Sequence, residues 1–277
     1  MQVLNPAWRA WIDENTARGC TPASMAEAMI QAGFEPAQAW AALQGEAMVA
    51  ASSAPVPQYQ YDPAPIKDGH RIDVGDREVE VILRMAQPQL AVFANVLSDD
   101  ECAEIIDRSR SKLERSTTVN PATGVHDVIS RRTSEGTFFP RCEDAFITRI
   151  DQRIARLMNW PLENGEGLQI LRYGVGGEYR PHFDYFPPHE PGSTVHLARG
   201  GQRVATLIVY LSDVAAGGET IFPDIQLHVA PRKGGAVYFR YTNQLGQVDP
   251  LSLHGGAPVL AGEKWIMTKW MRERSYG

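Results

Sequence analysis

Alternation of apolar and polar residues dominates the C-terminal two thirds of the chain. Val79, Val81 and Leu83 alternate with charged residues, which is the pattern of a strand with one buried face. Short apolar segments divided by glycine and proline predict further strands, which we place at 90–93, 168–173, 179–185, 203–211, 228–230, 235–240, 258–260 and 265–271. Many short strands separated by turn residues favour an all-β sandwich or jelly roll.

Helical periodicity occurs at the N-terminus and at two places among the strands. In residues 1–45, apolar residues recur at three- and four-residue spacing, as at Trp8, Trp11 and the following isoleucine, which predicts a bundle of three short helices. Ser98, with a glutamate three residues later, forms a capping box that opens another helix. A further helix over 146–157 ends before a proline. The predicted fold class is therefore α+β, with helices that support the sheets.

Composition divides the chain into three regions. Residues 46–75 begin with a stretch rich in alanine, serine and proline that has almost no periodicity, which predicts an extended linker. We therefore expect a small helical module over 1–45 and a main domain over 76–277. For the module, docking of a substrate or partner and simple stabilisation of the main domain are both open interpretations.

Charge and cysteine content limit the class of protein. The 277-residue chain has a formal net charge of −6, which argues against a nucleic-acid backbone or an anionic membrane as its main partner. Its three cysteines are widely separated and odd in number, so neither a disulfide framework nor a zinc knot is indicated. No apolar run is long enough to span a membrane. We expect a cytoplasmic protein with no nucleic-acid or membrane partner, and the sequence leaves its oligomeric state open.

Candidate metal ligands lie in two segments of the main domain. Successive side chains of a strand point to opposite faces, so His182 and Asp184 in the predicted strand 179–185 face the same side. His254, much later in the chain, would complete two imidazoles and one carboxylate. This set suits non-haem Fe(II) and leaves coordination positions open. Lys264 follows shortly afterwards, where its ammonium could anchor an anionic co-substrate.

A histidine and an aspartate two residues apart arise often by chance, but here further motifs surround the pair. Glycine-containing segments precede and follow it, at 173–179 (YGVGGEY), 217–223 (GGETIFP) and 252–259 (SLHGGAPV). With these motifs, the chain from about residue 89 to 272 resembles the prolyl 4-hydroxylase family of 2-oxoglutarate- and Fe(II)-dependent oxygenases. The resemblance implies a double-stranded β-helix, or jelly-roll, domain that uses Fe(II), 2-oxoglutarate and dioxygen, with ascorbate supporting the activity.

The resemblance also implies roles for individual residues. The metal-binding positions of the family correspond to His182, Asp184 and His254, its 2-oxoglutarate positions to Lys264, Tyr173 and Thr268, and its substrate positions to Tyr179, Arg203 and Trp270. Tyr173 and Thr268 could instead be ordinary strand residues with no role in binding 2-oxoglutarate. The tryptophan could instead belong to the core.

The activity implied by the resemblance is hydroxylation of an aliphatic carbon, with succinate and carbon dioxide as co-products. We expect the substrate to be a prolyl residue in a peptide or protein. A free amino or imino acid, or a natural-product intermediate, is the alternative substrate, because no residue separates these classes. Two different functions could use the same ligands: a 2-oxoglutarate or oxygen sensor without turnover, and a zinc hydrolase, for which no general base is evident at motif spacing.

A loop at 117–128 precedes a segment, around Thr133 and Ser134, that in the family follows a mobile loop able to fold over the substrate. The loop contains asparagine, proline and glycine, which suit a flexible turn. A lid is one interpretation of this loop, and an ordinary hairpin connection is the other.

Overall fold

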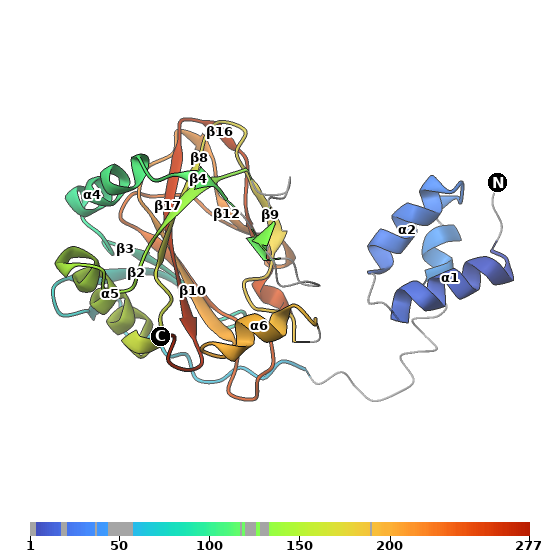
Figure 1. Ribbon diagram of the computed structural model, residues 1–277, viewed down its shortest axis with the longest axis horizontal. Helices are drawn as coiled ribbons and strands as arrows, with labels where there is room; N and C mark the ends of the chain where they lie inside the picture. Colours follow the sequence, from blue (N-terminus) through green and yellow to red (C-terminus); the bar gives the residue numbers. More distant parts are fainter. Residues whose placement is uncertain are drawn as a thin grey trace. The chain divides into compact units, whose positions relative to one another are not determined.

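The computed structural model describes residues 4–17, 21–36, 38–43, 58–116, 118–119, 126–127, 133–188 and 190–277. The chain divides into two compact units, Met1–Gln58 and Tyr59–Gly277 (Figure 1). In the described residues, no helix combines the length and the apolar character needed to cross a membrane. Most of the loop at 117–128, and therefore the lid hypothesis, falls outside the described residues.

The N-terminal unit is a small bundle of helices. It contains α1 (Pro6–Ala17), α2 (Pro22–Gln31) and a further helical stretch at 36 and 38–43. The Thr21 hydroxyl caps α2 by accepting a hydrogen bond from the amide of Ser24 (3.2 Å). The stretches pack around a shared core of Ile12, Met25, Ala26, Met29, Phe34, Ala39 and Leu43. The prediction of three short helices is confirmed.

The second unit is built from two antiparallel sheets. The large sheet has the order β1 (Arg71–Asp73), β2 (Glu78–Met85), β3 (Leu90–Ala94), β14 (Ala236–Arg240), β10 (Arg203–Tyr210), β17 (Lys264–Arg272), β8 (Leu168–Tyr173), β7 (Glu135–Phe139) and β4 (Glu114–Arg115). The small sheet has the order β13 (Leu227–Val229), β12 (Thr220–Phe222), β15 (His254–Gly256) and β9 (Tyr179–His182). Two short pairs join β11 (Ala216–Gly217) to β16 (Val259–Ala261) and β5 (Thr118–Val119) to β6 (His126–Asp127).

Among the described residues of this unit, three α-helices and three short 3-10 helices connect these strands. They are α4 (Asp99–Arg110), α5 (Ala145–Met158), α6 (Ser193–Ala198), η1 (Leu162–Asn164), η2 (Pro223–Ile225) and η3 (Pro250–Ser252). The predicted capping box of α4 is confirmed. The Ser98 hydroxyl accepts from the Glu101 amide (3.1 Å), and the Glu101 carboxylate accepts from the Ser98 amide (2.9 Å).

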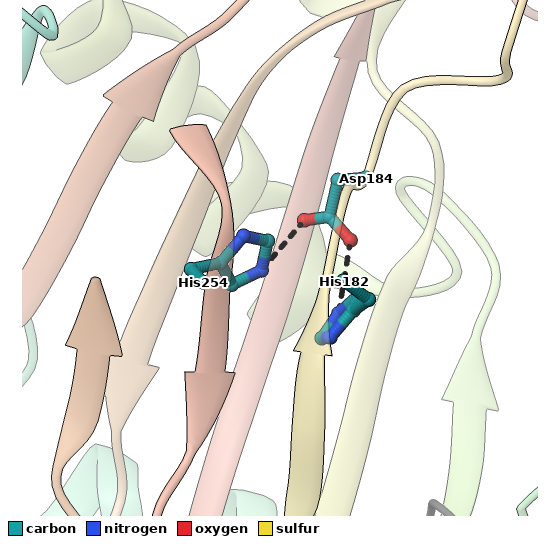
Figure 2. Close-up of side chains that lie close together, drawn as sticks. All are labelled: His182, Asp184 and His254. Atoms are coloured by element: carbon teal, nitrogen blue, oxygen red, sulfur yellow. Dashed lines mark ion pairs between the residues drawn. The ribbon is translucent and has the colours of Figure 1, made fainter. Parts of the chain in front are cut away.

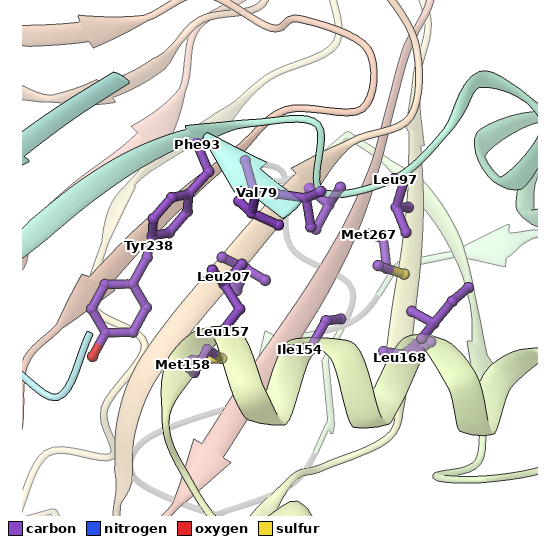
Figure 3. Close-up of a cluster of buried hydrophobic side chains, with 14 of the residues drawn as sticks. Val79, Phe93, Leu97, Ile154, Leu157, Met158, Leu168, Leu207, Tyr238 and Met267 are labelled. Atoms are coloured by element: carbon purple, nitrogen blue, oxygen red, sulfur yellow. The ribbon is translucent and has the colours of Figure 1, made fainter. Parts of the chain in front are cut away.

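Alternation along the central strands produces two cores. In β10, Leu207 belongs to the outer core, where Ile154 and Leu157 of α5 pack on the large sheet (Figure 3). The next residue, Ile208, belongs to the inner core, which joins the large sheet to the small one through residues such as Phe222. The central strands are therefore buried on both faces, and the space between the two sheets is left for the site.

Several elements differ from the prediction. Strand β9 ends at His182, so the expected strand 179–185 is too long and Asp184 lies in the bend that follows. The elements that were not predicted have two to six residues and show too little periodicity of their own. They are β1, β4, β5, β6, β7, β11, β12, β15 and helix α6. Residues 59–75, placed in the linker by composition, belong to the second unit, where Ile66 is buried in the outer core.

Candidate metal centre

The three predicted metal ligands line one cavity of about 680 Å³ that lies between the two sheets. His182 ends β9 and pairs directly opposite His254, which begins the neighbouring strand β15. Asp184 reaches the same point from the bend after β9. Figure 2 shows the two rings and the carboxylate turned toward one another, and one donor atom from each lies within 4.8 Å of the others.

Both imidazoles present the same nitrogen to this point. His182 Nε2 is 3.6 Å from one carboxylate oxygen of Asp184, and His254 Nε2 is 3.5 Å from the other. On the far side of each ring, Nδ1 donates to a backbone carbonyl, that of Arg180 (2.9 Å) or Ser252 (3.0 Å). A carbonyl can only accept, so the proton is on Nδ1 and the Nε2 lone pair is available to a metal. Such a set suits a divalent metal with open coordination positions.

The carboxylate of Asp184 is buried and is oriented by two hydrogen bonds. The Thr206 hydroxyl (2.7 Å) and the Trp270 indole N–H (3.0 Å) both donate to Oδ2. Burial alone would raise the pKa of Asp184, but the nearby His254 and His182 hold it well below its usual range. Burial lowers the pKa of His254 to about 4, so this ring is neutral near pH 7, as a metal ligand must be.

Lys264 is a buried cation farther along the same cavity. It lies opposite Tyr173 in the pairing of β17 with β8, and its Nζ is 5.5 Å from the centre of the Tyr173 ring. Only 3% of Lys264 is exposed, and burial lowers its pKa to about 8. Within the described part of the chain, its ammonium has no hydrogen-bond or ion-pair partner. Thr268 lies on the same face of β17 and also lines the cavity. An anionic ligand would satisfy this cation.

The three residues predicted to meet the substrate also line the cavity, and two of them are tied to the metal centre. Arg203 pairs with Glu166 through two contacts, of 2.7 Å and 3.0 Å, and its guanidinium lies 3.8 Å from the centre of the Trp270 ring. Trp270 in turn donates to the carboxylate of Asp184. Tyr179 is half-buried and stacks on the His182 ring at 3.7 Å.

Sequence reasoning missed three residues that support the site. Thr206 is a single polar residue within the apolar run of β10, and Glu166 stands between two glycines, so each gave a weak signal that could have been pursued. The Tyr241 hydroxyl lies 3.0 Å from the Thr206 hydroxyl. Nothing in its local sequence distinguishes it from a core tyrosine.

Comparison with known proteins identifies the family. Residues 168–272 match the family model of the 2OG-Fe(II) oxygenase superfamily. The chain is 37% identical over 229 residues to probable prolyl 4-hydroxylase 10 of Arabidopsis thaliana, with 76% of this chain and 77% of that relative covered. It is 40% identical over 224 residues to prolyl 4-hydroxylase 1 of the same plant, again with 76% and 77% covered.

A solved structure agrees with these sequence matches. The viral collagen prolyl hydroxylase of Paramecium Bursaria Chlorella virus-1, in its 2-oxoglutarate complex, superposes with a TM-score of 0.52 at 29% identity, covering 66% of this chain and 95% of that chain. The predicted jelly-roll fold is confirmed, and the chain is an enzyme. It belongs to the prolyl 4-hydroxylase family of 2-oxoglutarate- and Fe(II)-dependent dioxygenases.

Proposed function

We propose that this enzyme hydroxylates a prolyl residue within a peptide or protein. The observation that carries the proposal is the convergence of His182, Asp184 and His254 on one point of a cavity that also contains the buried ammonium of Lys264. The names of the relatives, prolyl 4-hydroxylases at 37% and 40% identity, support a prolyl substrate.

The residues present fit Fe(II) and 2-oxoglutarate. His182, Asp184 and His254 would hold the metal, since two neutral imidazoles and one carboxylate are ligands of non-haem Fe(II). Lys264 would pair with the distal carboxylate of 2-oxoglutarate, with the hydroxyls of Thr268 and a tyrosine, Tyr173, as further donors. When bound, iron and 2-oxoglutarate supply hydroxylation of an unactivated C–H bond by dioxygen, with release of succinate and carbon dioxide.

The remaining work of the protein is to orient the reactants and exclude water. Leu171 and Ile266 line the cavity near Lys264 and keep its wall apolar, which strengthens a charge pair formed there. Arg203 and Trp270 would form a rigid wall for the substrate, because each is already fixed by a carboxylate. We propose Tyr179 as the third substrate contact, beside the ring of His182.

Succinate formation tests this function. Purified enzyme would be assayed with Fe(II), ascorbate and 2-oxoglutarate, in the presence of proline-rich peptides or free proline, and the variants His182→Ala and Lys264→Ala would be compared with the wild type. We expect stimulation by peptides, a product heavier by one oxygen atom, a need for ascorbate in sustained turnover, and loss of succinate in both variants. Stimulation by free proline alone would favour a small-molecule substrate. Absence of succinate despite bound iron would refute the proposal.

A further inference from the structure

The segment that enters the second unit is an extended strap, residues 59–63, that is fastened by side chains at the end of the large sheet. The Gln60 amide donates to the side-chain oxygen of Gln247 (3.0 Å), and the Asn243 side chain donates to the Gln60 carbonyl (2.8 Å). The Asp62 carboxylate pairs with Arg240 (2.6 Å) and accepts from the Gln244 amide (2.9 Å). Most partners of the strap therefore belong to one short stretch that follows β14.

That stretch is a hairpin, residues 241–249. The Asp249 amide donates to the Tyr241 carbonyl (2.8 Å) at its base, and Thr242 forms a bridge with Val248. At its tip, the side-chain oxygen of Asn243 accepts from two backbone amides of the turn. The same Asn243 side chain bonds the strap through its nitrogen. The strap and the hairpin thus hold each other in one geometry.

Each end of the hairpin is connected to one metal ligand through a series of hydrogen bonds. At the first end, the Tyr241 hydroxyl contacts the Thr206 hydroxyl, which donates to the carboxylate of Asp184. At the second end, Asp249 accepts from the Leu251 amide (2.9 Å) and so caps η3. The last residue of η3 supplies the carbonyl that accepts from Nδ1 of His254. Bonds that orient two of the three metal ligands therefore arise from this one hairpin.

The strap also covers the buried base of the hairpin. Asp249 is only 1% exposed, and burial raises the pKa of its carboxyl. Tyr61 of the strap lies against this carboxyl. Burial and, to a smaller extent, the Asp249 carboxylate raise the pKa of Tyr185, the residue after the ligand Asp184. Displacement of the strap would expose Asp249 to water and loosen the cap that it provides.

We propose that the strap is a positioning element of the metal centre, which acts through the hairpin 241–249 on Asp184 and His254. The proposal rests on the proposed function only in that these residues bind a divalent metal. Failure of wild-type enzyme to bind such a metal would overturn the function itself. Normal wild-type binding that strap variants leave unchanged would overturn only the role of the strap.

The test measures the affinity of the full-length chain for Mn(II), together with the visible spectrum of its Co(II) form. Asp62→Ala removes the ion pair with Arg240, and Tyr61→Ala uncovers Asp249. Asp68→Ala is the matched control, because Asp68 is an exposed acidic residue a few positions farther along the chain. We expect Mn(II) binding to weaken about tenfold in both strap variants, as is typical when residues that orient ligands are lost, and to be unchanged in the control. The Co(II) spectrum should shift in the strap variants alone.

A purely structural strap would lower the melting temperature and leave Mn(II) affinity within twofold of the wild type, which would overturn the proposal. If Asp62→Ala does not fold, Asp62→Asn replaces it, since the amide keeps the shape of the side chain and an acceptor for Gln244. Unchanged Mn(II) affinity in Asp62→Asn and Tyr61→Ala together would equally overturn the proposal.

Discussion

Replacing Lys264 with methionine should stabilise the ligand-free enzyme while destroying its affinity for 2-oxoglutarate. Lys264 is 3% exposed and has no hydrogen-bond or ion-pair partner within the described residues, so folding buries its charge with little compensation. Methionine has a similar length and no charge. Stability and ligand binding should therefore change in opposite directions, which is uncommon for a substitution in a core strand.

The size of the stability gain follows from the proton affinity of the amine. Its pKa is lowered from 10.5 to about 8. Each tenfold change in proton affinity corresponds to about 1.4 kcal/mol, so burial of the charged amine costs up to about 3 kcal/mol. For a domain of this size, Lys264→Met should raise the melting temperature by about 5–10 °C at pH 7. Loss of one partner of a buried charge pair costs about 3–5 kcal/mol, so 2-oxoglutarate should bind at least about a hundredfold more weakly.

The difference in stability between Lys264→Met and the wild type should also depend on pH. Below about pH 8 the amine is charged in both the folded and unfolded states, and the full cost of burial is present. Between about pH 8 and 10.5 the unfolded state binds more protons than the folded state, so the stability of the wild type rises toward that of the variant. Denaturant unfolding at pH 7 and at pH 9.5 would measure this convergence.

Lys269 provides a matched control on the same strand. Its Nζ lies 2.7 Å from a carboxylate oxygen of Asp151, and both side chains are buried. Lys269→Met would leave Asp151 as an uncompensated buried charge and should destabilise the enzyme by about 3–5 kcal/mol. Thermal melts and calorimetric 2-oxoglutarate titrations of both variants complete the experiment. A lower melting temperature for Lys264→Met, or 2-oxoglutarate affinity within tenfold of the wild type, would refute the reasoning.

Three further substitutions test other parts of the structure. Thr206→Val removes a hydrogen-bond donor to Asp184 and should weaken Mn(II) binding about 10-fold or more, as measured by titration. Mn(II) affinity equal to that of the wild type would show that this hydrogen bond does not orient Asp184. Glu166→Ala leaves two guanidiniums, those of half-buried Arg203 and buried Arg272, without their shared carboxylate. It should cost about 3–5 kcal/mol in urea unfolding, and a loss below about 1 kcal/mol would contradict this expectation. Ser98→Ala removes the N-terminal cap of α4 and should lower the free energy of unfolding by about 1 kcal/mol in the same assay. Binding of 2-oxoglutarate should be unchanged, and a loss of binding would contradict a purely local effect.

Strands that are mostly apolar and bounded by turn residues were predicted from sequence, including the three-residue strands β13 and β16, and strands without such a pattern were not. Residues 168–173 form β8 as expected, since most of its six residues are apolar and a glycine stands at each end. Strand β15 consists of a histidine and two glycines, and glycine is depleted in strands. Its strand conformation comes from pairing with β9 and β12, which are distant in sequence. Local periodicity carries no information about such pairing.

The candidate site was predicted in its residue types and only partly in its geometry. His182, Asp184 and His254 converge as expected, although Asp184 does so from a bend and not from a strand. The contact of Thr206 with Asp184 could not be predicted from its weak local signal, because a threonine in β10 reaches this carboxylate only through the pairing of whole sheets. The pairing of Arg203 with Glu166 likewise depends on contacts between segments far apart in the chain.

The placement of His182 at the end of β9 has a consequence for amide hydrogen exchange. β9 is an edge strand of four residues, and among the described strands it pairs only with β15. A metal ion held by both His182 and His254 would cross-link the two strands, and opening of β9 would then require release of the ion. Amides at the β9–β15 pairing should therefore exchange slowly in the metal-loaded enzyme and rapidly after the metal is removed by a chelator. Metal occupancy would thus set the rate at which β9, the strand that carries His182, opens locally.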